Sequence, residues 1–233
     1  MNAKALVVLS GGQDSTTCLY WAIDKFGREN VSSVTFDYGQ RHRIELTSAA
    51  EIADFTGVPN VILPIDTFAA LGGDALTATD IAVESTLDED SGLPNTFVPG
   101  RNLIFLTFAA AFAYQRNIAH LVTGVAQTDY SGYPDCREET MKSLQMAIQQ
   151  GMESELQIHT PLMHLSKKET VELAQVLGAL PAMAMTHTCY NGERPPCGHC
   201  AACELRAKGF AEAGVSDPLL ARDAKARYPQ PAS

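Results

Sequence analysis

The fold class is set near the amino terminus by residues 5–15, with the sequence Ala5-Leu6-Val7-Val8-Leu9-Ser10-Gly11-Gly12-Gln13-Asp14-Ser15. The apolar run 5–9 is typical of a short strand that is buried on both faces, as in a parallel sheet. The glycine-rich turn after it lies where open α/β sheets bind anions. Amide groups at the start of the next helix, with the hydroxyls of Ser10 and Ser15, can hold phosphate oxygens there. An ordinary turn in which Ser15 or Asp14 caps the helix is the alternative interpretation.

Apolar runs alternate with helical patterns along the rest of the chain, which predicts an open, mainly parallel twisted sheet with flanking helices. Strands are expected at 5–9, 31–36, 61–65 and 120–123. Helices are expected to end at Gly27 and Gly57, and to cover 101–115 and 136–150. Another helix is opened by a capping box at 166–169 and closes at Gly178. Residues 71–96 lack a sustained period and are expected to form a long loop.

The composition is that of a globular protein with a sizeable core. Of the 233 residues, 45% are apolar and 19% are charged, which excludes disorder and a coiled coil. The formal net charge of −10 disfavours a general nucleic-acid binder, although a local basic pocket can still hold a small anionic substrate. The most apolar segment, 103–114, is far shorter than the roughly 20 residues that span a bilayer. Because the amino terminus also lacks the features of a signal peptide, we expect a cytoplasmic protein without membrane contact.

The cysteine distribution indicates a metal site in the carboxyl-terminal part of the chain. Four of the six cysteines have the spacing C-x7-C-x2-C-x2-C, namely Cys189, Cys197, Cys200 and Cys203. Four thiolates in a tetrahedron suit a structural zinc ion. The run C-x2-C-x2-C also occurs in ferredoxins, so an iron–sulfur centre is the alternative, and His187 and His199 are expected to be bystanders. We expect an α/β domain at 1–183, a zinc-binding helical subdomain at 184–228 and a tail at 229–233.

The turn at 10–15 resembles the Ser-Gly-Gly-x-Asp-Ser loop of ATP pyrophosphatases. It lacks the Gly-Lys-Ser/Thr ending of a P-loop and the G-x-G-x-x-G pattern of dinucleotide-binding folds. In that family the loop holds the pyrophosphate part of ATP while a substrate oxygen attacks the α-phosphate. Because the carboxylate of Asp14 would repel phosphate, we infer that Mg²⁺ lies between them.

Three further loops carry polar and aromatic groups and are expected to form the rim of the same site. They cover residues 37–42, 97–102 and 129–137, near the carboxyl ends of strands in one sheet. Arg101 and Arg137 could each bind a carboxylate or a phosphate as a fork. Tyr130 could stack on a planar heterocycle, and Asp129 could accept hydrogen bonds from ring N–H groups. Lys167 could neutralise a leaving pyrophosphate, or simply be solvated in the first turn of its helix.

The chain as a whole resembles the 7-cyano-7-deazaguanine synthases of queuosine biosynthesis. The matching segments are 9–19, 35–43, 95–106, 131–137 and 189–203, so the likeness covers nearly the whole chain. The resemblance implies an adenine-nucleotide α-hydrolase-like fold. It also implies a ligase that converts 7-carboxy-7-deazaguanine, ammonia and ATP into the 7-cyano product, by way of an adenylated acid and an amide. A homodimer and a bound zinc ion held by the four clustered cysteines are implied as well.

Site residues carry over from this resemblance position by position. ATP contacts are expected from Leu9, Ser10, Gly11, Gly12, Gln13, Asp14, Ser15 and Thr16, and catalytic roles from Asp14 and Ser15; a catalytic role is assigned to Lys167 on chemical grounds. Contacts with the deazapurine acid are assigned on chemical grounds to Arg101, Asp129, Tyr130 and Arg137. No glutamine-hydrolysing segment is recognisable, so we expect free ammonia to be used.

Three other functions share the glycine-rich turn. A tRNA-modifying ATP pyrophosphatase would need a basic face and an RNA-binding region, which the charge of −10 and the chain length argue against. A non-catalytic nucleotide-binding module would bind ATP without releasing pyrophosphate. An argininosuccinate-like ligase would leave the cysteine cluster unexplained.

Overall fold

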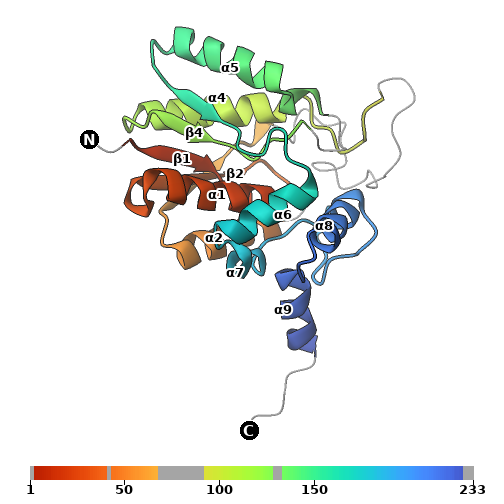
Figure 1. Ribbon diagram of the computed structural model, residues 1–233. Helices are drawn as coiled ribbons and strands as arrows, with labels where there is room; N and C mark the ends of the chain where they lie inside the picture. The colour runs from red at the N-terminus through yellow and green to blue at the C-terminus, as the bar shows by residue number, and fades with distance from the viewer. Residues whose placement is uncertain (1–2, 41–42, 68–91, 128–132, 228–233) are drawn as a thin grey trace.

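One parallel sheet forms the centre of the protein. The computed structural model describes residues 3–40, 43–67, 92–127 and 133–227 (Figure 1). The strands are ordered β3-β2-β1-β4-β5, and every neighbouring pair is parallel. They are β1 (Ala5–Val8), β2 (Val31–Asp37), β3 (Asn60–Pro64), β4 (His120–Val122) and β5 (Gln157–His159). The predicted parallel sheet with flanking helices is confirmed.

Helices cover both faces of the sheet (Figure 1). The described helices are α1 (Gln13–Phe26), α2 (Ile44–Thr56), α4 (Arg101–Tyr114), α5 (Glu138–Gly151), α6 (Lys167–Val176), α7 (Leu180–Met183), α8 (Ala201–Glu212) and α9 (Pro218–Arg227). Helices α4 and α5 lie on one face, and α1, α2 and α6 lie on the other. The described residues include no helix long and apolar enough to cross a membrane.

The central strand β1 is buried on both of its faces. Leu6 belongs to the core under α4 and α5, together with Leu106 and Met141. Val7 belongs to the opposite core, which includes Leu19 of α1 and Ile52 of α2. Because successive side chains of a strand point to opposite faces, a strand in this position needs the unbroken apolar run that the sequence shows.

The predicted elements match the observed ones with small shifts at their ends. The helix predicted at 136–150 begins at Glu138, after a 3-10 turn at Pro134–Cys136. The predicted capping box is present, because Glu169 N donates to Ser166 Oγ at 3.2 Å and Ser166 N donates to Glu169 Oε2 at 2.8 Å. Strand β5 and helix α7 escape prediction, since three and four residues are too short to show a period. Most of the loop predicted at 71–96 lies outside the described residues.

The carboxyl-terminal helix α8 packs closely on α6. A Cβ atom at Gly209 would lie only 3.0 Å from the carbonyl oxygen of Lys167, so a glycine is needed for this approach. On the same helix, the buried guanidinium of Arg206 donates to both carboxylate oxygens of Asp217, at 2.6 and 2.8 Å, and to Thr186 Oγ1 at 2.8 Å. It therefore fixes the segment after α7 to α8. The domain boundary predicted at 183/184 stays a prediction.

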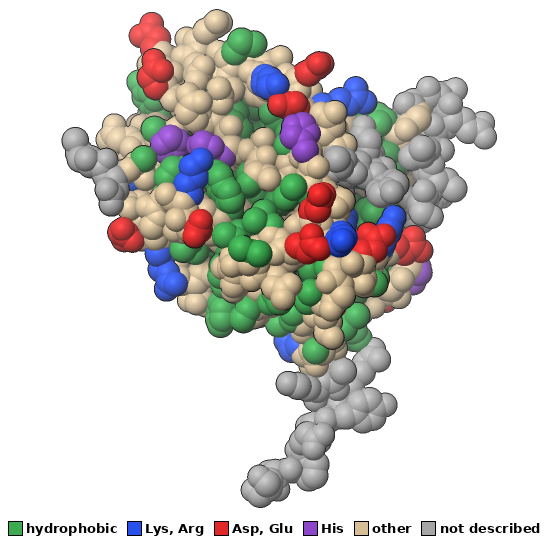
Figure 2. Space-filling model, in the orientation of Figure 1, with side chains coloured by type: hydrophobic (Ala, Val, Ile, Leu, Met, Phe, Trp, Pro, Cys, Tyr) green, Lys and Arg blue, Asp and Glu red, His purple; other side chains and the backbone are tan. Residues whose placement is uncertain are grey.

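The charged side chains of the face drawn in Figure 2 are intermixed. Among the described residues of that face, Lys and Arg side chains lie between Asp and Glu side chains and do not gather into one basic patch. The described residues include helical pairs four residues apart, such as Lys142 with Glu138 at 2.8 Å and Lys168 with Glu172 at 3.6 Å. Exposed pairs of this kind contribute little to stability.

Candidate active site

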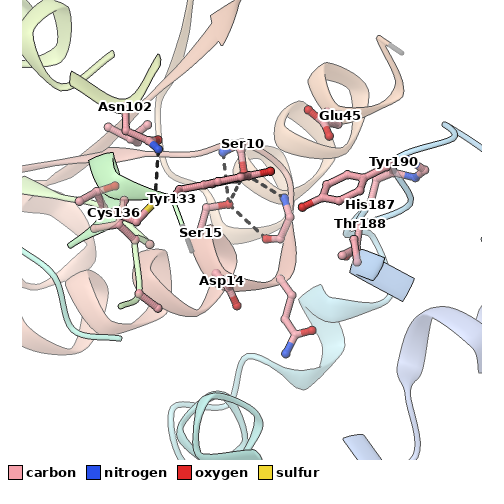
Figure 3. A pocket seen from close by; sticks show the side chains of 18 of the residues that line it. Ser10, Asp14, Ser15, Glu45, Asn102, Tyr133, Cys136, His187, Thr188 and Tyr190 are labelled. Atoms are coloured by element: carbon pink, nitrogen blue, oxygen red, sulfur yellow. Dashed lines mark hydrogen bonds between the residues drawn. The ribbon is translucent and has the colours of Figure 1, made fainter. Parts of the chain in front are cut away.

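A cavity of about 310 Å³ lies at the carboxyl ends of the central strands. Residues at the ends of β1, β2 and β4 line it, together with the first residues of α1, α4 and α6. Strand β1 lies between β2 and β4, which is the point where the strand order reverses. Open parallel sheets bind their ligands at this position. Figure 3 shows how Ser10, Ser15 and Tyr190 lie around the cavity.

The turn after β1 leaves the amino-terminal end of α1 open to an anion. Helix α1 begins at Gln13, and no side chain caps it at Gly12. The hydroxyl oxygens of Ser10 and Ser15 lie 3.0 Å apart, and the Ser15 hydroxyl donates to the carbonyl oxygen of Gly12 at 3.1 Å (Figure 3). Amide groups in the first turn have no partner within the helix and, with the helix dipole, favour an anion. This geometry supports an anion site over the side-chain cap.

Two close contacts fix the position of this turn. Gly11 has a φ of +84°, and a Cβ atom there would lie 2.4 Å from the carbonyl oxygen of Glu45 in α2. At the end of β4, a Cβ atom on Gly124 would lie 3.1 Å from the backbone nitrogen of Ser15. A side chain at Gly11 would therefore push the turn away from α2. The glycines of the motif and of the β4 loop are needed for packing as well as for ligand access.

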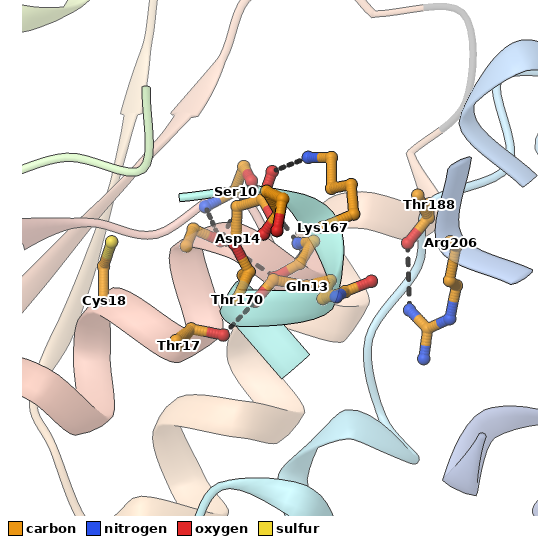
Figure 4. Close-up of polar contacts among 12 residues, drawn as sticks. Ser10, Gln13, Asp14, Thr17, Cys18, Lys167, Thr170, Thr188 and Arg206 are labelled. Atoms are coloured by element: carbon orange, nitrogen blue, oxygen red, sulfur yellow. Dashed lines mark hydrogen bonds and ion pairs between the residues drawn. The ribbon is translucent and has the colours of Figure 1, made fainter. Parts of the chain in front are cut away.

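The first residues of α1 and α6 place two opposite charges in the cavity. Lys167 Nζ lies 2.7 Å from Asp14 Oδ2, and both side chains are partly exposed to the cavity (Figure 4). The neighbouring Gln13 is 5% exposed, and its Nε2 is buried without a partner among the described residues. A buried donor without a partner is costly. Together, the Gln13 amide donor and the Lys167 ammonium group make this side of the cavity suited to a polyanion.

The other half of the cavity has aromatic walls. The ring centres of Tyr38 and Phe105 lie 5.2 Å apart, and Arg101 Cζ lies 5.8 Å from the centre of the Tyr38 ring. Tyr133 is buried, and its hydroxyl lies within hydrogen-bond distance of Thr96 Oγ1, at 2.7 Å. Aromatic faces beside a guanidinium suit a planar ligand that carries an acidic or carbonyl group.

Glu45 adds a carboxylate to this aromatic half. Its side chain comes from the first turn of α2 and lines the cavity. Burial raises the pKa of Glu45 to about 7, and the positive charge of Arg101 offsets only part of this rise. Near neutral pH this carboxyl group is therefore partly protonated.

Replacing Glu45 by glutamine should stabilise the protein at alkaline pH. A raised pKa means that the folded state binds more protons than the unfolded state between about pH 4.5 and 7, so Glu45 destabilises the fold increasingly over that range and fully above it. We expect the gain in melting temperature of Glu45→Gln over the unchanged protein to be larger at pH 8.5 than at pH 5. Thermal unfolding at both pH values measures it, with Glu51→Gln on the same helix as the charge-matched control. A gain that is equal at both pH values would contradict the assigned pKa.

Many of the predicted site residues meet in this cavity. Those that line it are Ser10, Gly12, Gln13, Asp14, Ser15, Arg101 and Lys167, and from the predicted rim loops also Tyr38, Gln40, Asn102, Tyr133 and Cys136. Three others lie behind the turn: Leu9 and Thr16 are fully buried, and Gly11 packs against α2. Arg137 is exposed at the start of α5 and is not among the residues that line the cavity. Asp129 and Tyr130 lie outside the described residues.

Other residues line the cavity although sequence patterns give them no role. They are chiefly Glu45, Phe105, His187 and Tyr190. An acidic residue in a first helical turn is common for reasons of helix stability, and Phe105 stands in an apolar helix, so neither pattern signals a binding site. The segment 187–190 gives one signal, because it contains the expected metal ligand Cys189.

The four clustered cysteines come together in space. Their sulfur atoms all lie within 4.8 Å of one another, and Cys197 Sγ lies 3.8 Å from Cys203 Sγ. Zn–S bonds of about 2.3 Å in a tetrahedron place the sulfurs about 3.8 Å apart. The backbone amides of Cys197 and Cys200 point at the sulfurs of Cys189 and Cys197, at 3.5 and 3.4 Å, as expected for thiolate ligands. The donor set therefore fits a single tetrahedral ion.

The fold and this site define a class of α/β proteins with a serine–glycine turn after the first strand. Five parallel strands, the Ser10–Ser15 turn with its open helix end, and a carboxyl-terminal cysteine cluster are its features. The sequence model of the family described as "Queuosine biosynthesis protein QueC" matches residues 4–214. The chain belongs to this family.

Relatives with high identity cover nearly the whole chain. A protein of Chromobacterium violaceum is 70% identical over 94% of each chain, and one of Laribacter hongkongensis is 64% identical over 94% of each chain. A protein of Bacillus subtilis is 52% identical over 90% of this chain and 94% of its own. Each of the three is called 7-cyano-7-deazaguanine synthase. The resemblance stated from the sequence is thereby confirmed.

Proposed function

We propose that this protein is a ligase that converts 7-carboxy-7-deazaguanine, ammonia and ATP into 7-cyano-7-deazaguanine. The family and the names of its relatives support this reaction. The observation that carries it is the division of one cavity into an anion-binding half and an aromatic half. ATP phosphates and a planar acid can thus meet at the end of β1.

The chemistry needs two activations of the same carbon. A carboxylate reacts poorly with ammonia because oxide would have to leave, so its oxygen first attacks the α-phosphate of ATP and pyrophosphate departs. Ammonia then displaces AMP and loses a proton, which gives the amide. The amide oxygen attacks a second ATP, pyrophosphate departs again, and loss of AMP and a proton leaves the nitrile. The balance is two ATP consumed, with two AMP and two pyrophosphates formed, for each nitrile.

The anion-binding half is suited to the pyrophosphate part of ATP. The open amides at the start of α1 and the hydroxyls of Ser10 and Ser15 would bind phosphate oxygens, and Gln13 Nε2 would find an acceptor. Lys167 Nζ, now paired with Asp14, would neutralise charge on the departing pyrophosphate. Asp14 is the carboxylate placed to hold Mg²⁺, which binds through one or two carboxylates plus substrate phosphates and supplies further neutralisation.

The aromatic half is suited to the deazapurine acid. Tyr38 and Phe105 offer ring faces for stacking, and Arg101 can bind the carboxylate as a fork. Substrate contacts from Asp129, Tyr130 and Arg137 stay predictions. Closure of this half by aromatic walls would also keep water away from the adenylated acid.

The remaining expectations are part of the same proposal. The cysteine cluster would hold a structural zinc ion, because a site with four protein ligands is closed to substrate. Free ammonia would be the nitrogen source, and a homodimer in the cytoplasm the working form. Elemental analysis should find about one zinc per chain. The visible spectrum should show no absorbance from iron.

The experiment that tests the reaction is product analysis with the purified protein. Incubation with 7-carboxy-7-deazaguanine, ammonium chloride and Mg·ATP should give the nitrile by mass spectrometry, with AMP and pyrophosphate. A single-turnover reaction should show the amide as an intermediate. ADP and phosphate as products would mean attack at the γ-phosphate and would overturn the role of the turn. ATP binding without pyrophosphate release would indicate a non-catalytic module.

A further inference from the structure

Glu45 and Arg101 present opposite charges to the same half of the cavity without touching. Both side chains line the cavity, one from the start of α2 and the other from the start of α4. Neither forms a side-chain hydrogen bond or an ion pair with another described residue, although each lies in the electrostatic field of the other. An ion pair would be the expected outcome if the two side chains could meet. Because both side chains line the cavity, a ligand bound there can reach both charged groups.

A carboxylate at this position selects for the pattern of donors on a ring. An ionised carboxylate is an acceptor only, with two oxygens side by side, and it matches two adjacent N–H donors. The 2-aminopyrimidin-4-one edge of a 7-deazaguanine has such a pair, the ring N1–H and the 2-amino group. The adenine edge of ATP instead has an amino donor next to a ring nitrogen acceptor, and this acceptor would face the second oxygen unfavourably.

We propose that Glu45 is the specificity-determining residue for the deazapurine and that it accepts hydrogen bonds from the ring N1–H and the 2-amino group of the substrate. This inference rests on the proposed function. Arg101, on the other side, then faces the carbonyl and carboxylate oxygens of the same ring system. The donor and acceptor edges of the substrate would be matched to the two charges of the cavity.

The ionisation of Glu45 is consistent with such a role. Burial raises its pKa to about 7, because the ionised form is poorly solvated at this position. Two N–H donors from a ligand would stabilise the ionised form. A poorly solvated carboxylate lowers the stability of the fold. Residues with such perturbed pKa values are typical of functional sites.

The test compares two ligands on two proteins. The ligands are 7-carboxy-7-deazaguanine and its analogue without the 2-amino group, and the proteins are the unchanged chain and Glu45→Gln. For the unchanged protein we expect kcat/KM at saturating ATP to fall by about 10- to 100-fold when the 2-amino group is removed. For Glu45→Gln the same removal should change kcat/KM by less than about threefold. Glu45→Asp, which keeps the charge, should retain the preference, and Glu51→Gln on the same helix should behave as the unchanged protein.

The outcomes separate this inference from the reaction itself. Equal discrimination by the unchanged protein and Glu45→Gln would overturn the role of Glu45 while leaving the proposed function intact. Glu45→Gln could instead raise the KM for ATP and leave the preference for the 2-amino group unaltered. That result would place the carboxylate against the nucleotide and would also overturn the proposed role of Glu45. Failure of the unchanged protein to form the nitrile would instead contradict the proposed function. Thermal unfolding distinguishes all of these from misfolding, since Glu45→Gln is expected to be the more stable protein above pH 7.

Discussion

Replacing Lys167 by methionine is expected to lower the rate of pyrophosphate release by about 100- to 1000-fold, the usual effect of losing one group that stabilises transition-state charge. The ammonium group lies beside the open end of α1, 2.7 Å from Asp14 Oδ2. Negative charge grows on the bridging oxygen as pyrophosphate departs, and methionine has nearly the same length but no charge. Pyrophosphate release at saturating ATP and deazapurine acid measures the effect.

The adjacent lysine provides a matched control for this prediction. Lys168 is exposed and paired with Glu172 at 3.6 Å, so Lys168→Met should leave the rate within about twofold. A fall of less than about tenfold for Lys167→Met would contradict a direct role on the phosphates.

A double variant decides whether Lys167 acts on pyrophosphate or only on Asp14. If the ammonium group merely neutralises Asp14, then Asp14→Asn combined with Lys167→Met should recover most of the rate, because no unpaired charge is left. If both residues act on Mg·ATP, the double variant should be at least as slow as either single variant. We expect the second result, since residues that act as a unit do not contribute additively.

The fold was predictable where one local pattern has one physical meaning. The run 5–9 is apolar at every position because β1 is covered on both faces, and the turn after it must lie at the ligand edge of a parallel sheet. The capping box at Ser166 identifies the first turn of α6 and thereby predicts that Lys167 is the first residue of that helix. Strand β5 could not be predicted, because three residues with partly exposed side chains show no clear alternation.

The anion-binding half of the site was predictable for the same reason, and the aromatic half only in part, through Arg101 and the loops that hold Tyr38 and Tyr133. A serine–glycine turn acts through its own backbone, so its sequence describes its chemistry. Glu45 and Tyr190 reach the cavity only because α2 packs on Gly11 and because the segment after α7 folds back beside the turn, where His187 N donates to Gly11 O at 2.9 Å. Contacts of this kind depend on tertiary packing between distant segments. Arg137, predicted from its place in the 129–137 loop and from its fork of N–H donors, is exposed at the start of α5 and is not among the residues that line the cavity.

Loss of the metal is expected to destabilise the protein and to open the part of the cavity wall that lies next to the metal site. The four sulfurs lie within 4.8 Å of one another, and thiolates so close repel strongly unless a cation lies among them. Cys203→Ser should therefore lower the bound zinc well below one per chain. We expect it to cost at least about 4 kcal/mol of unfolding free energy, or roughly 8–16 °C in melting temperature for a chain of this size. Cys136→Ser, a change of the same type outside the cluster, should keep its zinc.

The effect should extend to ATP binding because the metal site and the cavity share one segment. Cys189 is a ligand, while its neighbours Thr188 and Tyr190 line the cavity, and Arg206 fixes Thr188 Oγ1 to α8 at 3.0 Å. Without the ion, one of the anchors of this segment is lost. Cys203→Ser should thus raise the Kd for ATP, measured by calorimetry at a temperature where the variant is still folded. A variant that loses its zinc but binds ATP as tightly as the unchanged protein would mean that the remaining contacts of the segment hold the wall, and that the metal serves stability only.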